Sequence, residues 1–339
     1  MTQRIGVNVA RRGFFARHGM LLVMLVGVVA AGMLVVHYGL REILGSIAGV
    51  GWGILAVAGA HLVQVALSAL AWRAVASPIS QGALSLFVLA RWIREAVSSL
   101  LPMTQIGGEV IAARLLTLKG LRAGPAAATV VLDLGMEIVS QAVFTMVGLA
   151  LLILDGHHGP VIEWTVLGLA GMLAIVPVFI LAQRRGLFHA TERIFDRLGE
   201  RFPLLGNASL EGLHDTIHAI YRAPSALFRS IIVHFLSWLA GAFELWLVLY
   251  FLRTPVSFPH ALILESLSQA IRSVAFMVPG AVGVQEGGFV LLGALYGLSP
   301  PVSLALSLVK RVREFVLGMP ALLVWHQLES RRWWRAAEQ

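Results

Sequence analysis

Cysteine is absent from this chain, and charged residues are scarce. The lack of cysteine excludes disulfide bonds and thiolate chemistry. Charged residues form 13% of the 339 residues, whereas soluble domains carry about 25%. The longest polar stretch, from Gln183 to about Arg229, is too short for a separate catalytic domain, and no HExxH, P-loop, Rossmann or GxSxG motif occurs. The sequence therefore predicts no enzymatic activity, no cofactor and no metal site. A metal site at His157 and His158 stays an alternative, with only Asp155 and Glu163 as nearby carboxylates.

Apolar residues dominate instead. They make up 58% of the chain, and the mean hydropathy is +0.82, which is typical of a multi-pass membrane protein. The net charge of +8 is also typical of nucleic-acid-binding proteins. In a membrane protein it indicates lysine and arginine on cytoplasmic loops that face anionic lipid. We therefore expect an all-α polytopic membrane protein whose partners are membrane lipids and not nucleic acid.

Several apolar stretches are long enough to cross a membrane, which takes about 20 residues. The first could instead be a signal peptide, because arginines precede it, but its core is long and no polar cleavage region follows. Lysine and arginine gather before the first stretch, in the polar segment 183–229 and after the last. With six spans, the positive-inside rule then places both termini in the cytoplasm. The six stretches are Met20–Tyr38, Trp52–Trp72, Pro125–Leu154, Glu163–Ala182, Ser230–Leu252 and Pro301–Leu328.

The polar segment 183–229 carries two amphipathic patterns. Apolar residues from Leu187 to Phe202 fall on one helical face, and so do Leu210, Leu213, Ile217 and Ile220. The patterns predict two short helices that lie on the cytoplasmic membrane surface. A regulatory docking site is the alternative.

Two further apolar stretches are interrupted near their centres. Residues 84–118 break at PMTQIGGE, and residues 261–297 break at PGAVGVQE. A shift of 177 residues, the separation of Pro102 and Pro279, also carries Glu109 onto Glu286. A constant shift that aligns both breaks indicates an internal repeat. The predicted halves are residues 1–158 and residues 159–339.

Each half contains two spans, a broken hairpin and a further span. If a hairpin enters and leaves at the same face, each half crosses the membrane three times, and the second half is inverted relative to the first. The first hairpin then enters from the cytoplasm and the second from the opposite face, with their tips meeting near the midplane. Alternatively, each hairpin crosses fully, which gives ten spans. The arm Ile106–Leu118, about 20 Å long at 1.5 Å per residue, favours re-entry.

Charged and polar side chains gather in the hairpins and in the last span of each half. A charge left on lipid at the bilayer centre costs about 2.5–3.5 kcal/mol, so these groups must pair or line a wet cavity. The broken backbone is tolerated only inside protein or beside water. The predicted break residues are Pro102, Gly107, Gly108, Pro279, Gly280, Gly283 and Gly287. The predicted substrate pathway consists of Glu109, Glu286, Arg94, Glu95, Arg272, Gln105, Gln285, Asp133, Glu137, Lys310, Arg311, Arg313 and Glu314.

Opposite charges occupy equivalent positions of the repeat. The shift carries Asp133 onto Lys310 and Glu95 onto Arg272, and we expect these residues to pair across the central axis. For Glu109 and Glu286 the candidate partners are the arginines at positions 94, 272, 311 and 313. The alternative is that all these groups form purely structural ion pairs.

The stretch PGAVGVQEGGF, followed by LYGLSPPVSLALSLVKRVREFVLGMPALLVW, resembles the flippase-like family that includes the transmembrane part of the lysylphosphatidylglycerol synthases. The resemblance is strongest to its hopanoid-associated HpnL branch. It implies a multi-pass protein of the bacterial inner membrane that moves or presents a lipid between leaflets, with a hopanoid or related polar lipid as cargo. Lipid lysinylation is not implied, because the soluble transfer domain of the full synthases is missing from this sequence. The first hairpin departs from the PGxxGxxE pattern, so the two half-sites need not be equivalent. The residues of this sequence that match the family pattern are Pro279, Gly280, Gly283, Glu286, Gly287, Arg311, Arg313 and Glu314.

Translocation of a hopanoid or phospholipid is the leading functional interpretation. A non-translocating scaffold for lipid-synthesis enzymes is the main alternative, although it would need no charges at the midplane. A membrane-embedded enzyme that acts on lipid is a third interpretation, but the sequence shows no nucleophile or metal cluster beside the paired glutamates. Ion-coupled transport of a soluble solute is the fourth.

Overall fold

The computed structural model describes residues 48–101, 106–156, 212–274 and 281–337, with single residues at 41, 45, 163, 166, 170 and 171. Within these ranges the regular secondary structure is helical, as the composition predicts. The helices are α3 (Gly53–Ala76), α4 (Leu84–Leu100), α5 (Ile106–Leu118), α6 (Ala123–Leu154), α9 (Leu213–Tyr221), α10 (Pro224–Phe251), α11 (Phe258–Val274), α12 (Val284–Ala294) and α13 (Pro300–Ala337).

Three described helices, α3, α6 and α10, are long and apolar enough to cross a membrane. Large apolar side chains such as Leu62 and Phe243 are exposed on them, which suits a surface covered by lipid. These helices confirm the multi-pass membrane prediction. The expected span Pro301–Leu328 forms part of α13, which carries several charges. The expected spans Met20–Tyr38 and Glu163–Ala182 lie outside the described residues, apart from four isolated positions in the second of them.

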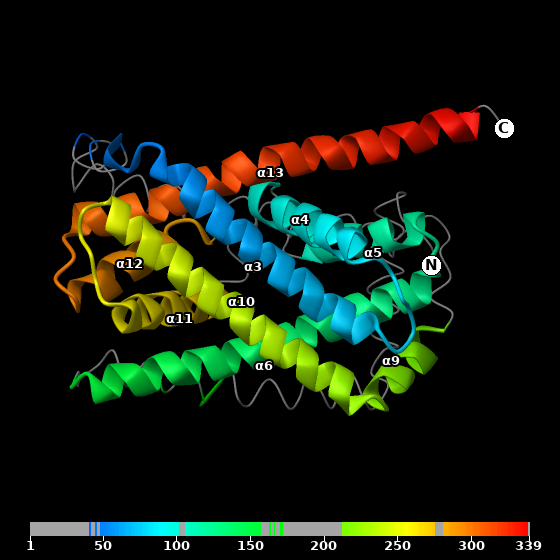
Figure 1. Ribbon diagram of the computed structural model, residues 1–339, viewed down its shortest axis with the longest axis horizontal. Helices are drawn as coiled ribbons and strands as arrows, with labels where there is room; N and C mark the ends of the chain where they lie inside the picture. The colour runs from blue at the N-terminus through cyan, green and yellow to red at the C-terminus, as the bar shows by residue number, and fades with distance from the viewer. Residues whose placement is uncertain are drawn as a thin grey trace, which may run out of the picture.

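The four long helices run in two opposite directions. α3 and α10 run side by side in opposite directions, and α6 and α13 also run in opposite directions (Figure 1). The close contact of α3 with α10 depends on Gly53, where a Cβ atom would lie 2.6 Å from the ring of Phe251. The beginning of α3 therefore lies against the end of α10.

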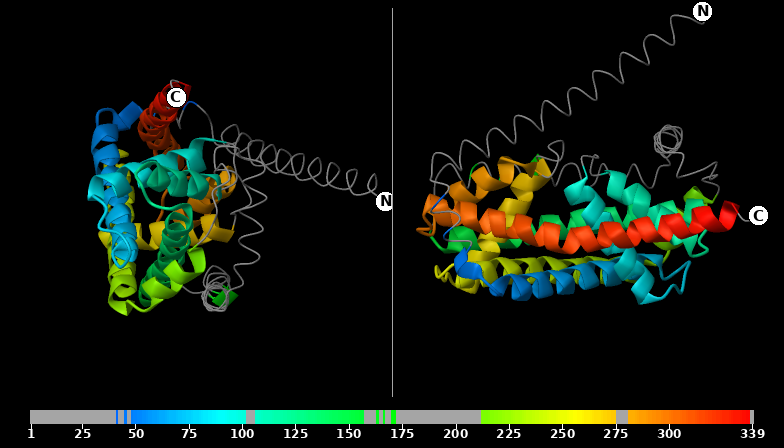
Figure 2. Two further views of the ribbon diagram at one scale, coloured as in Figure 1. Left: turned by 90° about the vertical axis from the view of Figure 1, so that its right-hand side faces the viewer. Right: turned by 90° about the horizontal axis from the view of Figure 1, so that it is seen from above.

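Two shorter helical hairpins fill the space between the long helices. α4 packs against α5, and α11 packs against α12. The first hairpin lies toward one end of the bundle and the second toward the opposite end, which both figures show (Figures 1 and 2). Shifting α4, α5 and α6 by 177 residues brings their first residues within three positions of the first residues of α11, α12 and α13. The same order of hairpin and long helix therefore occurs twice.

Each hairpin packs against the long helix that follows the other hairpin in the sequence. α13 packs against α4, and α6 packs against α11. Trp92 on α4 donates its indole N–H to the carbonyl oxygen of Leu317 on α13 at 3.0 Å. On α6, Gly148 allows α11 to approach closely, because a Cβ atom there would lie 2.8 Å from the Cβ of Ser266 on α11. The hairpins are thus held by both parts of the chain.

The predicted break residues are only partly placed at breaks. Pro102, Gln105, Pro279 and Gly280 lie outside the described residues. Gly107 and Gly108 lie inside α5 and Gly287 lies inside α12, so the prediction is wrong for these three. Gly108 instead permits contact with α4, since a Cβ atom would lie 2.5 Å from the carbonyl oxygen of Arg94 and would overlap Ser98. Gly283 directly precedes α12 with a φ of +81°, a conformation that favours glycine.

The amphipathic face of α9 is also corrected. Leu213, Ile217 and Ile220 are buried and pack with apolar residues of α6 and α10, among them Leu132 and Leu227. This face therefore contacts protein and does not lie on the membrane surface. The span that follows begins at Pro224, earlier than expected, because proline is well suited to the first turn of a helix. The first predicted surface helix, with Leu187, lies outside the described residues.

Candidate functional site

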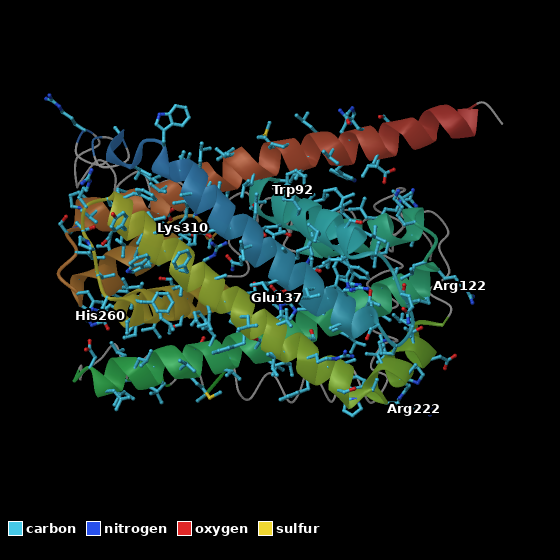
Figure 3. All side chains as sticks on the ribbon, viewed as in Figure 1. Trp92, Arg122, Glu137, Arg222, His260 and Lys310 are labelled. Atoms are coloured by element: carbon cyan, nitrogen blue, oxygen red, sulfur yellow. The ribbon has the colours of Figure 1, made fainter. Side chains whose placement is uncertain are left out.

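Buried charged side chains extend through the interior of the helical bundle. Glu137 and Lys310 are two of these charged residues, and both lie away from the ends of the bundle (Figure 3). The spacing of the charges along each helix explains why they meet. Arg91 and Arg94 are one turn apart on α4, and Asp133 and Glu137 are one turn apart on α6, so each pair shares a helical face.

The first cluster joins α4, α5, α6 and α10. Arg94 donates from Nε to Glu109 Oε1 at 2.8 Å and from Nη1 to Asp133 Oδ2 at 2.8 Å. Arg91 donates from both terminal nitrogens to the carboxylate of Glu137, at 2.8 and 2.5 Å. Because Asp133 is fully buried, its charge needs these arginines. The members of the first cluster are Arg91, Arg94, Glu109, Asp133, Glu137 and His234.

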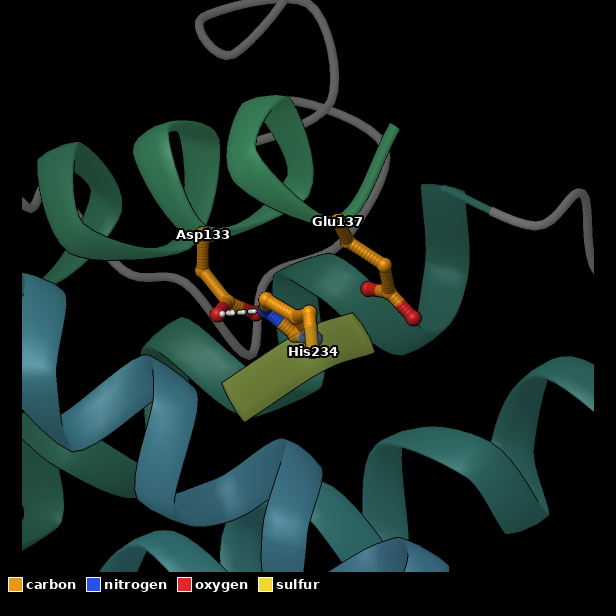
Figure 4. A group of neighbouring side chains, drawn as sticks. All are labelled: Asp133, Glu137 and His234. Atoms are coloured by element: carbon orange, nitrogen blue, oxygen red, sulfur yellow. Dashed lines mark hydrogen bonds and ion pairs between the residues drawn. The ribbon is translucent and has the colours of Figure 1, made fainter. Parts of the chain in front are cut away.

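His234 completes the first cluster from α10. Its Nε2 lies 3.0 Å from Asp133 Oδ1, while Glu137 lies on the next turn of α6 (Figure 4). Asp133, Glu137 and His234 bring their ligand atoms within 4.8 Å of one another, a spacing that could hold a metal ion. However, both carboxylates already accept hydrogen bonds from guanidinium groups, and a cation would have to displace them. We therefore assign no metal to this group.

The second cluster forms a closed ring of contacts between α11, α12 and α13. Arg272 Nη1 donates to Gln285 Oε1 at 2.8 Å, and Gln285 Nε2 donates to Ser307 Oγ at 3.0 Å. The serine donates onward to Glu286 Oε1 at 3.2 Å, and Arg311 donates to the same oxygen at 3.3 Å. Glu314 closes the ring at 3.7 Å from both arginines. The members of the second cluster are Arg272, Gln285, Glu286, Ser307, Arg311 and Glu314.

Glu286 has a structural task in addition to its ionic contacts. Its Oε2 accepts a hydrogen bond of 2.7 Å from the backbone N–H of Gly283, directly before α12. The carboxylate thus satisfies one of the free donors at the start of the helix and interacts favourably with the helix dipole. The break in this stretch therefore creates a helix start that its own glutamate caps.

A third group, the junction, consists of His61 on α3, Glu95 on α4, Glu244 on α10 and Arg313 on α13. The ring of His61 lies between two carboxylates, with Nε2 2.6 Å from Glu95 Oε1 and Nδ1 2.8 Å from Glu244 Oε2. Arg313 reaches Glu244 at 3.2 Å and Glu95 at 3.6 Å. The junction therefore ties together four helices through one imidazole ring and one guanidinium group.

The predicted pairs across the central axis are wrong. Asp133 contacts arginines of α4, and Lys310 contacts Glu265 on α11 at 2.6 Å. Glu95 contacts Arg313, while Arg272 contacts the second cluster. The repeat aligns these positions in sequence, but a hairpin helix supplies the nearer partner for Asp133 and Lys310, and α3 and α13 supply the partners of Glu95. Glu109 and Glu286 each contact one of the four candidate arginines, which is Arg94 for Glu109 and Arg311 for Glu286.

Sequence reasoning missed several members of these groups. Glu244 is the single carboxylate of α10, and neither it nor His61 or His234 is among the predicted pathway residues. The available signal was the presence of ionisable residues near the middle of membrane-length helices. Arg91 and Glu265 shared helical faces with predicted residues but were left out of the pathway. The histidines His157 and His158 lie outside the described residues, and Asp155 next to them contacts His260 at 3.4 Å.

Exposure distinguishes two residues from the rest of the ionic network. The side chains of Glu95 and Arg272 are 33% and 28% exposed, and the other described ion-pair members of the three groups are at most 17% exposed. These two residues carry opposite charges and occupy equivalent positions after the shift of 177 residues. They contact consecutive residues of α13, since Glu95 contacts Arg313 and Arg272 contacts Glu314. The network is therefore most open beside this part of α13.

Comparison with known proteins identifies the family. The model of the lysylphosphatidylglycerol synthase TM region matches residues 20–321. A UPF0104 membrane protein of Methanothermobacter thermautotrophicus (strain Delta H) is 25% identical over 238 residues, which cover 65% of this chain and 68% of the relative. The matched region contains all three ionic groups described above. This chain, with its membrane-length apolar helices, belongs to the family of the lysylphosphatidylglycerol synthase transmembrane region.

Proposed function

We propose that this protein is flippase-like and moves a polar lipid between the two leaflets of a membrane. The observation that carries the proposal is the ionic network inside a bundle of membrane-length apolar helices. Buried charges are costly in a membrane, and they commonly mark a substrate pathway. The family membership supports the same function.

The lipid headgroup contacts Glu95 and Arg272 in this proposal. A carboxylate attracts the ammonium group of a headgroup, and a guanidinium group binds phosphate or another anion through paired N–H donors. The two residues together suit a zwitterionic headgroup. The apolar tails stay in the surrounding bilayer, against outward-facing side chains such as Leu62 and Phe243. The resemblance of the sequence indicates a hopanoid-related lipid, and a phospholipid is the other candidate cargo.

The two hairpins enter the membrane from opposite faces in our proposal, as parts of an inverted repeat. Their location toward opposite ends of the bundle and the opposite directions of α6 and α13, the long helices that follow them, support this arrangement (Figure 1). Arg122 and Arg222 lie at one end, while His260 lies at the other (Figure 3). The positive-inside rule assigns the arginine end to the cytoplasm. We place the protein in the bacterial inner membrane with its network near the midplane.

The test is lipid movement in vesicles that contain the purified protein. A phospholipid with an intact zwitterionic headgroup and a fluorescent group on one acyl chain is added to both leaflets, and a membrane-impermeant reductant then quenches the accessible fraction. The wild-type protein should make nearly all of the label accessible, and Glu95→Gln and Arg272→Gln should each slow this movement at least about tenfold, the effect of losing about 1.4 kcal/mol of binding. A hopanoid with the same labelled group, tested in parallel, identifies the preferred cargo.

Matched controls use the same substitutions at exposed positions. Glu163→Gln and Arg222→Gln remove one charge each at exposed positions away from the network, and both should leave lipid movement unchanged. Without lipid movement, the reductant reaches only the label in the outer leaflet. If about half of the label stays fluorescent in vesicles with well-folded wild-type protein, the proposal is wrong.

A static scaffold for lipid-synthesis enzymes is the second candidate. It is favoured by the close pairing of the buried charges, for example of Lys310 with Glu265 and of Arg91 with Glu137. Such pairs can hold helices together without any transport. The vesicle assay separates the two functions, because a scaffold leaves the labelled lipid where it was.

A further inference from the structure

The junction consists of His61, Glu95, Glu244 and Arg313. If His61 is neutral and both glutamates are ionised, one of the two contacts between the imidazole ring and a carboxylate has no hydrogen to share. A neutral imidazole has one N–H donor and one acceptor nitrogen, and an ionised carboxylate only accepts. Yet each ring nitrogen of His61 lies within 2.8 Å of a carboxylate oxygen from a different helix. Both contacts are hydrogen bonds only if the histidine and its two glutamates together hold one additional proton.

The charges of the junction also indicate one additional proton. Glu95 and Glu244 contribute two negative charges, and Arg313 contributes one positive charge. A proton on the ring of His61, or shared with a carboxylate, makes the group neutral. His61 and Glu244 are buried, and a buried group with a net charge is costly in a membrane. Neutrality therefore favours the protonated junction.

Charges on neighbouring helices do not alter this balance. The positive charges of Lys310 and Arg91 attract the carboxylates of Glu244 and Glu95, respectively. The negative charges of Glu265 and Glu314 attract Arg313. Lys310 is already paired with Glu265, and Arg91 is already paired with Glu137. In the described part of the chain, Arg313 is then the cation that directly contacts the junction carboxylates.

We infer that the junction is a proton-binding site that couples the proposed lipid movement to a proton gradient, an inference that rests on the proposed function. Glu95 has the most exposed side chain of the four, so the proton enters and leaves through it. With the proton bound, the ring of His61 joins Glu95 on α4 to Glu244 on α10.

Loss of the proton changes the contacts of Arg313. Its Nη1 lies 2.7 Å from both ring nitrogens, and a guanidinium N–H can donate to a ring nitrogen only when that nitrogen carries no hydrogen. After deprotonation the free nitrogen accepts from Arg313, and the carboxylate that it faced loses its donor. Glu95, the exposed one, becomes hydrated, and α4 is released from α3. The proposed headgroup contact Glu95 is thus available in one protonation state and tied to His61 in the other.

Vesicles with a pH gradient test the coupling. With about one pH unit across the membrane, the labelled lipid should accumulate in one leaflet, approaching a ratio of about ten if one proton accompanies each lipid, because one pH unit is a factor of ten in proton activity. An ionophore that collapses the gradient should abolish the asymmetry. His61→Gln should distribute the lipid equally, and His326→Gln, an exposed histidine on α13, should behave like the wild type.

The outcomes separate the two proposals. Lipid movement without asymmetry in the wild type overturns proton coupling and leaves the flippase proposal intact, whereas absence of any movement overturns the flippase proposal and the coupling with it. The proton site itself has an independent readout in the thermal unfolding of the detergent-purified protein. If the folded state holds a proton that the unfolded chain releases, the midpoint falls as pH rises, and His61→Gln should lose this dependence while His326→Gln keeps it. The same pH dependence in wild type and His61→Gln would overturn the proton site, whatever the lipid assay shows.

Discussion

Arg91 on α4 and Glu137 on α6 form a two-point ion pair, with Nη1 2.8 Å from Oε2 and Nη2 2.5 Å from Oε1. Both side chains are largely buried, and the pair joins the first arm of a hairpin to a long helix of the bundle. It is therefore a direct way to ask whether the ionic network stabilises the fold or serves transport.

Replacing one member of this pair should be strongly destabilising. Arg91→Met leaves Glu137 buried without its main partner, and loss of one partner from a buried pair costs about 3–5 kcal/mol. Replacing both, as Arg91→Met with Glu137→Leu, should restore most of that loss. Unfolding of the purified protein in mixed detergent measures each variant. A double variant as unstable as the single one would show that the pair does more than neutralise charge.

The two glycines Gly108 and Gly287 should respond in opposite ways to alanine. A Cβ atom at Gly108 meets the backbone of α4 at Arg94, so Gly108→Ala forces the two hairpin arms apart, at a cost of about 1–3 kcal/mol. At Gly287 nothing lies within 4 Å of the added atom, and Gly287→Ala should stabilise α12 by up to about 1 kcal/mol. Thermal unfolding of the two variants in detergent checks the difference. Equal midpoints would contradict the close packing of α4 on α5.

The apolar face of α9 should tolerate no charge. Ile217 is fully buried against α6, and Ile217→Asp removes its packing and buries an unpaired polar group, which should cost about 3–5 kcal/mol. Ala219→Asp, on the exposed side of the same helix, is the matched control and should be nearly neutral. Limited proteolysis of the region before α10 reports the effect. Similar cleavage of both variants would show that this face is not packed against the bundle.

A disulfide between α4 and α13 should stop lipid movement if the first hairpin has to move. A Cβ atom at Gly318 would lie 3.6 Å from the Cβ of Ala96, close to the separation of about 3.8 Å in disulfides, and the only competing contact at under 3.0 Å is with the flexible side chain of Leu100. The chain has no other cysteine, so Ala96→Cys with Gly318→Cys gives a single bond. Oxidised vesicles should be inactive, and reduction should restore the rate. Full activity of the oxidised protein would show that this contact stays closed during transport.

Membrane orientation is testable by cysteine labelling against the same cysteine-free background. Arg4→Cys, Glu200→Cys and Arg335→Cys should react only with reagent on the cytoplasmic side, because the positive-inside rule places these segments there. His157→Cys should react only from outside. Outside labelling of Glu200→Cys would contradict the inverted arrangement of the two halves.

The sequence by itself determined the class of the protein and the existence of two equivalent hairpins. A span of apolar residues needs no tertiary partner to be recognised, because its length is dictated by the thickness of the bilayer. The boundaries of α3, α6 and the first hairpin follow that pattern closely, with starts at Leu84 and Ile106 as expected, whereas α10 begins earlier and α13 ends later than the apolar stretches predict. The sequence also narrowed the partners of Glu109 and Glu286 to four arginines, and the structure pairs each glutamate with one of them.

Only the tertiary structure decided the remaining contacts. The pairing of His61 with Glu244 and Glu95 joins residues up to 183 positions apart, and no spacing along one helix indicates it. The face of α9 illustrates the same limit, because an amphipathic pattern looks alike whether lipid or protein covers it, and Ile217 turned out to be covered by protein. The partner of Asp133 was likewise decided by proximity, as Arg94 of the adjacent hairpin lies 2.8 Å away. Periodicity states which side of a helix is buried, while the packing of helices against one another determines what buries it.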